Sequence, residues 1–119
     1  MPTTTDHNVE QRPWGKYQIL CDEATFKAKR ITVLPGAQIS YQSHEKREER
    51  WIIVGGKGEV ILDEKVIPVQ LGTEIRIPIG AKHRIRNTGA ENIDFIEVQL
   101  GTYFGEDDII RYSDDYGRA

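Results

Sequence analysis

The sequence predicts an all-β fold, built as a sandwich or a barrel, and three observations support this. Short runs rich in Ile and Val follow one another along the chain, and turn-forming residues separate them. No stretch before residue 105 keeps a helical apolar period over a useful length. Many short strands at this spacing are typical of jelly rolls and related barrels.

Each expected strand is a short β-type run that ends in a turn signal. Residues 1–10 precede them and are polar, rich in Thr and aperiodic, so we expect a mobile tail there and a single domain over 11–119. Residues 38–44 are treated as a strand with alternating faces, and 105–118 as one helical turn followed by a tail. The other expected strands cover 16–20, 25–34, 50–54, 59–62, 66–71, 73–79, 83–87 and 93–100.

Among the glycines between these runs, we interpret four as turn residues at which the backbone needs a positive φ. They are Gly36, Gly56, Gly72 and Gly80. We assign no chemistry to them. The two tryptophans, Trp14 and Trp51, are expected in the core or at an interface.

Composition excludes several classes of protein. The chain has 119 residues, enough for one domain, and its net charge of −3, with both signs interspersed, argues against a general nucleic-acid binder. It has no run of about 18 apolar residues and no apolar N-terminal signal segment, so we expect neither a membrane span nor secretion. Cys21 is the single cysteine and cannot form an internal disulfide, which favours a cytoplasmic location.

Two polar segments, far apart along the chain, carry candidate metal ligands. Strand alternation places Gln42 and His44 on one face, and Glu49 opens the next strand. His83 follows a proline–glycine turn at the start of another strand. If these strands pair, two imidazoles, one carboxylate and one amide oxygen converge, and this set suits a divalent metal with mixed nitrogen and oxygen ligands.

Each of these residues also has a plainer interpretation when taken alone. His44 could be a surface side chain, and His83 could be a hydrogen-bonded histidine at the end of a strand. Glu49 lies in the run EKREER, and such runs are usually solvated faces. The four residues together, in phase with one another, favour the metal site.

Two further strands offer charged side chains to the predicted interior. Lys29 shares a face with Ile31 and Val33, so it either contacts an anion in the barrel mouth or reaches out of the barrel end. Glu97 and Gln99 share one strand face. If that face lines the barrel, Glu97 is a candidate base; otherwise it is an exposed residue.

The spacing of these polar residues and glycines resembles the two motifs of the cupin superfamily. The first motif corresponds to Gly36, Gln42, His44, Glu49 and Gly56, with Gln where many cupins have the first His. The second corresponds to Gly72, Pro78, Gly80, His83 and Asn87 and is complete. The resemblance implies a cupin-type double-stranded β-helix, which is a small jelly-roll barrel.

Longer segments narrow the resemblance to the type II phosphomannose isomerase domain, over residues 12–118. In that family the domain often follows a mannose-1-phosphate guanylyltransferase domain, which these residues lack, so the resemblance implies no guanylyltransferase activity. The segments are RPWGKY at 12–17, FKAKRITVLPG at 26–36, RWIIVGGKGEV at 50–60, IPIGAKHRIRN at 77–87, IEVQLGTYFGEDDIIRY at 96–112 and DDYGR at 114–118.

The family's metal pattern of Gln, His, Glu and His maps onto Gln42, His44, Glu49 and His83. The polar shell around these positions departs from the family. The family typically has a His-rich run after the Gln and a His before the Trp. In this chain Glu45 and Lys46 follow His44, and Arg50 precedes Trp51.

The resemblance implies a metal-dependent isomerase that interconverts mannose 6-phosphate and fructose 6-phosphate by proton transfer through an enediol. The four ligand positions would hold a divalent metal, with Zn²⁺ as first choice and Mn, Co, Ni or Fe as alternatives. Glu97 would act as base, Lys29 is a further catalytic candidate, and Lys29 and Arg111 would contact the substrate's anionic group.

Two other classes of function stay open. One is a non-catalytic cupin that binds a sugar or a sugar phosphate, and the other is a cupin epimerase or oxygenase, because the same barrel hosts many chemistries. The expected small-molecule partner is a sugar phosphate, with no nucleic acid and no membrane. Exposed strand edges favour pairing with a second copy, so we expect a homodimer.

Overall fold

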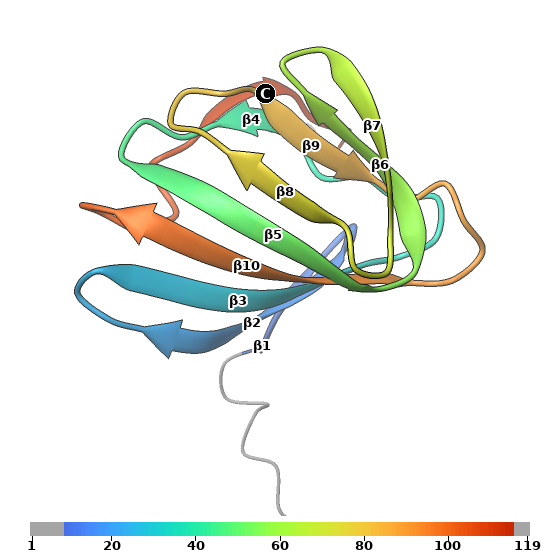
Figure 1. Cartoon of the computed structure of the whole chain (residues 1–119), viewed down its shortest axis with the longest axis horizontal. Coiled ribbons are helices and arrows are strands. Elements are labelled where there is room, and N and C mark those ends of the chain that lie inside the picture. The colour runs from blue at the N-terminus through green and yellow to red at the C-terminus, as the bar shows by residue number, and fades with distance from the viewer. Residues whose placement is uncertain (1–8, 116–119) are drawn as a thin grey trace, which may run out of the picture.

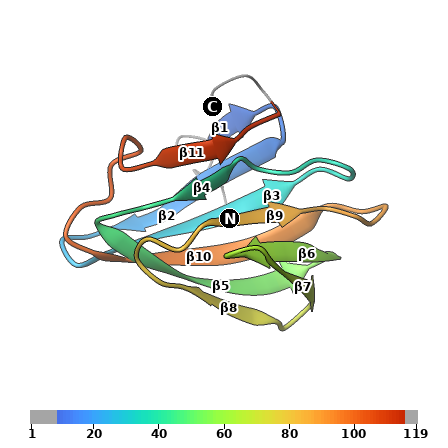
Figure 2. The ribbon, with the colours of Figure 1, turned by 90° about the horizontal axis from the view of Figure 1, so that it is seen from above.

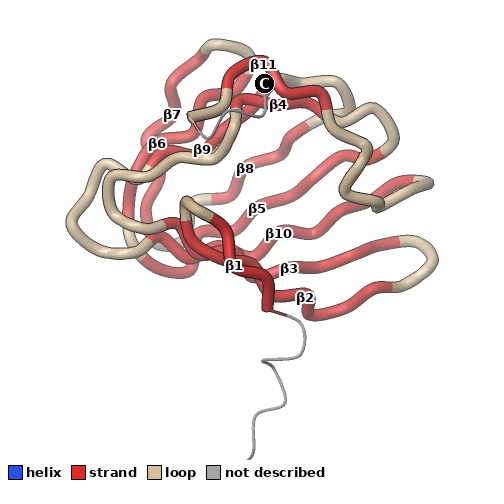
Figure 3. Tube along the Cα trace, turned by 180° about the vertical axis from the view of Figure 1, so that it is seen from behind, coloured by secondary structure: helices blue, strands red, loops and turns tan. Residues whose placement is uncertain are grey.

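The computed structural model describes residues 9–115, and within them the chain forms eleven strands and no helix (Figures 1 and 3). This confirms the all-β prediction, and every run expected to be a strand overlaps one. The strands are β1 Val9–Arg12, β2 Gly15–Asp22, β3 Phe26–Val33, β4 Tyr41–Ser43, β5 Arg47–Gly55, β6 Lys57–Leu62, β7 Lys65–Gln70, β8 Glu74–Ile77, β9 His83–Arg86, β10 Ile93–Gly101 and β11 Ile110–Ser113.

The strands form two antiparallel sheets that face each other (Figures 1 and 2). The six-stranded sheet has the order β1-β2-β3-β10-β5-β8, and the five-stranded sheet has the order β11-β4-β9-β6-β7. Because β10 returns from late in the chain to lie between β3 and β5, it pairs Glu97 with Lys29 on one side and with Trp51 on the other. The topology therefore gathers side chains that are distant in sequence.

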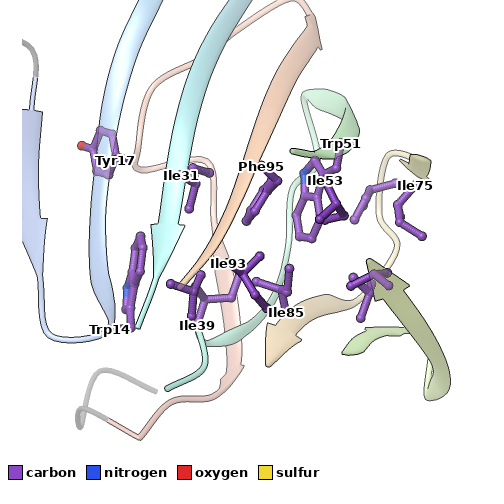
Figure 4. Packing of buried hydrophobic residues seen from close by; sticks show 14 of the residues in the cluster. Trp14, Tyr17, Ile31, Ile39, Trp51, Ile53, Ile75, Ile85, Ile93 and Phe95 are labelled. Atoms are coloured by element: carbon purple, nitrogen blue, oxygen red, sulfur yellow. The ribbon is translucent and has the colours of Figure 1, made fainter. Parts of the chain in front are cut away.

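The core lies between the sheets and follows from alternation along the longest strands. In β5 and β10 every second residue is buried, as period-2 patterning requires of a sheet with one covered face. Trp51 and Phe95 stack at 4.5 Å between ring centroids, and Figure 4 shows Ile53 and Ile93 packed beside them. Trp14 and Trp51 both belong to this core, as expected from the sequence.

The four turn glycines have the backbone conformation that the sequence predicts. Their φ angles are 78° at Gly36, 79° at Gly56, 91° at Gly72 and 82° at Gly80, a region that side chains disfavour. At Gly56 space also excludes a side chain, because an added Cβ would lie 2.3 Å from the carbonyl oxygen of Asn92. This close approach brings the β5–β6 turn against the start of β10.

Both ends of the described chain differ from the sequence expectation. Val9 and Glu10, assigned to the tail, form the start of β1 and pair with β2, whereas residues 1–8 lie outside the described residues. In the expected helical segment 105–118, a turn at 106–107 leads into β11, which pairs with β4. The free edge of β4 offers unsatisfied backbone groups, and a strand satisfies them where a helical turn would not. Residues 116–119 lie outside the described residues.

Residues 9–115 contain no helix with the length and apolarity needed to cross a bilayer.

Candidate metal centre

Two imidazoles and a carboxylate meet between the sheets. His44 follows β4, Glu49 lies in β5 and His83 begins β9. The Nε2 atom of His44 lies 3.3 Å from one oxygen of Glu49, and the Nε2 atom of His83 lies 3.9 Å from the other. All three candidate ligand atoms lie within 4.8 Å of one another, and all three residues are buried. The structure thus brings together three of the four residues that the sequence nominates.

The two imidazoles are held so that both Nε2 atoms face the centre. His44 Nδ1 contacts the backbone oxygen of Asp108 at 2.5 Å, and His83 Nδ1 contacts that of Ala81 at 3.0 Å. A carbonyl oxygen only accepts, so each Nδ1 carries the hydrogen and each neutral ring keeps its lone pair on Nε2. Burial lowers the pKa of both His44 and His83, and this effect outweighs the negative charge of Glu49, which acts to raise the pKa. The lowered pKa favours the neutral, ligating form of each ring.

Glu49 is kept ionised in spite of its burial. Burial alone would raise its pKa, but electrostatic interactions with His83, His44 and Arg47, with a hydrogen bond from Trp51, hold the pKa at about 2. With both imidazoles neutral, the positive charge beside the carboxylate is that of Arg47. The indole Nε1 of Trp51 donates to one carboxylate oxygen at 2.9 Å, and the Nε atom of Arg47 donates to the other at 2.9 Å. A carboxylate oriented on both oxygens is a preorganised ligand.

Arg47 is the part of the centre that sequence reasoning missed. Its guanidinium is buried, bonds Glu49 through Nε and lies 3.3 Å from His44 Nε2 through Nη2. In the sequence it sits in a charge run that is typical of a solvated face. The signal that could have found it is phase, because Arg47 alternates with Glu49 and Trp51 on one face of β5.

The main chain ties the two halves of the centre together. In the turn before β9, Gly80 N donates to the carbonyl oxygen of His44 at 2.8 Å, and Ala81 N donates to Pro78 at 3.1 Å. The positive φ of Gly80 lets the chain turn here. The turn that the sequence nominates as the carrier of His83 is therefore bonded directly to the first half-site.

The donors present fit a divalent cation. His83 Nε2 is buried and has no hydrogen-bond partner among residues 9–115, which is unusual for a polar atom unless something else satisfies it. Two neutral imidazoles and one ionised carboxylate are a ligand set that zinc and similar metals accept. Arg47 would compete with a cation, since it donates to Glu49 and approaches His44 at the same point.

Gln42, the fourth predicted ligand, lies beside this group. It pairs directly with His83 across β4 and β9, so both side chains point to one side of the sheet. Its Oε1 accepts a hydrogen bond from Ser40 at 2.7 Å. Gln42 is half-buried and lines the same pocket as His44, and its role as a ligand stays a prediction.

A charged pocket adjoins the metal centre, and His44 and Arg47 belong both to the centre and to the lining of the pocket. The predicted residues Lys29, Glu97 and Arg111 all line this pocket. Burial raises the pKa of Glu97 to about 8, reinforced by Glu49, whereas Lys29, Arg47 and Gln99 act in the opposite direction. Glu97 is thus an inward-facing residue, and at neutral pH it mostly carries a proton.

The fold and the site together define a class, and comparison with known proteins agrees. Two facing antiparallel sheets with a His, Glu and His group between them are the arrangement of a cupin. A solved cupin protein from Bacteroides fragilis matches with a TM-score of 0.63 and 26% identity, covering 71% of this chain and 72% of that one. The chain is a cupin-type double-stranded β-helix.

The particular family follows from the sequence comparisons. Residues 2–114 match the family described as Mannose-6-phosphate isomerase C-terminal, and the chain belongs to that family. A xanthan biosynthesis protein of Xanthomonas campestris is 46% identical over 115 residues, which are 97% of this chain and 25% of that protein. A mannose-1-phosphate guanylyltransferase of Salmonella montevideo is 44% identical over 112 residues, 94% of this chain and 24% of that protein. The chain therefore spans about a quarter of the length of these relatives.

Proposed function

We propose that this domain is a metal-dependent isomerase that interconverts mannose 6-phosphate and fructose 6-phosphate. The supporting observation is a single pocket that combines cationic side chains, a buried carboxyl group and His44, which also belongs to the His, Glu and His centre. The description of the matching family, Mannose-6-phosphate isomerase C-terminal, supports mannose 6-phosphate as the aldose, and isomerisation between C1 and C2 of that sugar gives fructose 6-phosphate.

The chain's own residues divide the work between them. His44, Glu49 and His83, with Gln42 beside them, would hold a divalent metal, for which Zn²⁺ is the first candidate. When bound, such a metal would supply Lewis acidity at the sugar oxygens. Lys29 and Arg111 line the same pocket and would bind the phosphate.

Glu97 is the proposed proton carrier. The reaction takes a proton from C2 of the aldose and delivers one to C1 of the enediol, so one carboxyl group above the sugar can serve both steps. A pKa raised towards 8 suits a group that must hold and release a proton near neutrality. Gln99 donates a hydrogen bond to Glu97 at 2.5 Å and orients it.

The direct test is a coupled assay of the purified chain with mannose 6-phosphate and added Zn²⁺, Mn²⁺ or Co²⁺. We expect metal-dependent turnover that is lost in Glu97→Gln while substrate still binds. As the base, Glu97 must be ionised, so kcat/KM should rise with pH as Glu97 loses its proton. The midpoint of this rise should lie between pH 4.5 and about 8, because a bound cation lowers the pKa of Glu97. A Glu97→Gln variant with unchanged turnover would remove the base assignment.

A second candidate is a non-catalytic module that binds a sugar phosphate, and Arg47 favours it. Its guanidinium bonds Glu49 and approaches His44, so it already compensates the buried carboxylate without a metal. The same assay separates the two: tight binding of mannose 6-phosphate with no turnover at full metal occupancy supports the module.

The homodimer and the cytoplasmic location also stay proposals. Among the described strands, β1, β8, β7 and β11 are the sheet edges that could pair with a second copy. Light scattering on the purified chain measures the first.

A further inference from the structure

One carboxylate occupies the cationic pocket from outside. The Lys29 ammonium, whose side chain is only 4% exposed, forms an ion pair with Glu106 Oε2 at 2.6 Å. The Glu106 side chain is 53% exposed. A buried ammonium needs an anionic partner, and here that partner comes from a residue that is half in solvent.

Cationic side chains outnumber carboxyl groups in the lining of the pocket, although Arg47 is paired with Glu49 and Arg12 with Glu10, both outside the lining. The lining includes four cationic side chains, those of Arg12, Lys29, Arg47 and Arg111, and two carboxyl groups, those of Glu97 and Glu106. The raised pKa of Glu97 keeps it largely protonated at neutral pH. Burial would raise the pKa of Glu106, but Lys29 lowers it overall, so Glu106 is ionised. Glu106 is therefore the carboxylate that supplies negative charge within the lining at neutral pH.

The segment that carries Glu106 is anchored by other residues. It runs from β10 in one sheet to β11 in the other (Figure 2). Asp108 accepts hydrogen bonds from the backbone N–H groups of Glu45 and Lys46 at 3.1 and 3.0 Å, and Thr102 N donates to Lys46 at 3.1 Å. These contacts flank Glu106 on both sides, so its side chain can leave Lys29 by rotation while the segment stays in place.

We propose that Glu106 is a displaceable internal ligand of an anion site, and that a phosphate group takes its place on Lys29. The carboxylate marks where an anionic oxygen sits against the ammonium. Arg12 and Arg111, which line the same pocket, would add charge-assisted hydrogen bonds to the entering phosphate. The inference rests on the anion-binding part of the proposed function and does not need isomerisation.

While Glu106 is bound to Lys29, an external anion cannot bind there. If Glu106 leaves the site open about a tenth of the time, the apparent affinity for an external anion is about tenfold weaker than that of a permanently open site. The test is calorimetric titration of inorganic phosphate into the full chain at neutral pH, without metal or sugar. Glu106→Gln should bind phosphate about tenfold more tightly than the wild type. Asp107→Asn is the matched control, because its carboxylate bonds Tyr103 outside this pocket, and it should bind as the wild type does.

Lys29→Met should abolish phosphate binding, and a thermal melt checks that it folds. Should it not fold, the comparison of Glu106→Gln with Asp107→Asn still decides. Equal phosphate affinity in those two variants overturns the inference, and so does an absence of phosphate binding in the wild type and Glu106→Gln alike. The outcome is independent of catalysis: tighter binding by an inactive chain supports the anion site and removes the isomerase.

Discussion

The inward face of the six-stranded sheet has two halves of opposite chemistry, although the same three strands, β3, β10 and β5, build both. In one half a cross-strand row is apolar, and in the other, two inward positions further along, it is polar or charged. The apolar row is Ile31, Phe95 and Ile53, and the polar row is Lys27, Gln99 and Glu49. The backbone pairing is continuous from the row of Phe95 to the row of Gln99, so the difference between the two rows lies in their side chains.

This contrast separates stability from chemistry. A large apolar side chain buried in the first half contributes about 1.5–3 kcal/mol of favourable burial. A buried charge in the second half loses hydration and is tolerated only because it is paired, as Glu49 is with Arg47 and Lys29 with Glu106. We conclude that one end of the barrel holds the fold together and the other end concentrates buried, paired charges.

The largest effect is expected from a deletion in the apolar half. Phe95→Ala should lower the free energy of unfolding by about 3–5 kcal/mol, because it removes a fully buried ring that stacks on Trp51. Gln99→Met, two inward positions along the same strand and similar in size, should cost far less. Urea denaturation measures both, and equal losses would contradict the division into two halves.

The next effect is on metal affinity in the polar half. His83→Ala removes one of three donors, and since disturbing even an outer hydrogen bond costs 10- to 100-fold, zinc affinity should fall by at least about 100-fold. Arg86→Ala, on the opposite face of β9, is the matched control and should keep the zinc affinity of the wild type. Calorimetric zinc titration and metal analysis after dialysis read the result. Retention of zinc by His83→Ala would place the ligands elsewhere.

The next effect depends on pH and is expected from Glu97→Gln. The pKa of Glu97 is raised from 4.5 to about 8 on folding, so its contribution to stability is present below pH 4.5 and is lost as the pH rises through about 8. The wild type should therefore lose stability relative to Glu97→Gln as the pH rises from 5 to 9. Urea midpoints across this range measure the gap. A gap that does not change with pH would mean that the Glu97 pKa is not raised.

The smallest effect compares neighbours on opposite faces of β5. Ile52 is 45% exposed and Ile53 is fully buried. Ile52→Thr should change the free energy of unfolding by less than about 0.5 kcal/mol, whereas Ile53→Val should cost about 0.5–1.5 kcal/mol. Denaturation of both variants under identical conditions is sufficient. A larger loss at Ile52 would show that a partner covers the outer face in solution.

Most of the fold is predictable because strand periodicity is a local signal. Runs such as 50–54 and 93–100 carry their own alternation, and the turn glycines mark where each ends. The sequence does not predict β1 and β11 as strands. Each has four residues of mixed polarity, and only its pairing with the edge of a neighbouring strand defines it. Nothing in four residues of mixed polarity distinguishes such a strand from a loop.

The candidate site was predictable in part for the same reason. Strand phase indicates which side His44 and Glu49 face, and the spacing of His44, Glu49 and His83 relative to glycines resembles the two cupin motifs, which implies that the three residues converge. Arg47 was hidden because a run of charges usually faces solvent. The contact between Lys29 and Glu106 joins residues separated by 77 positions through an irregular segment, and no periodic pattern reports such a pair.

The hydrogen bond from Gly80 N to the carbonyl oxygen of His44 has a consequence for how this domain could diversify. It joins main-chain atoms, so no change of side chain at position 44 or 83 removes it. A side chain substituted at position 44 or 83 should therefore start from the same place in the fold as the present one. The link between the two half-sites can therefore persist while the donors at these positions change.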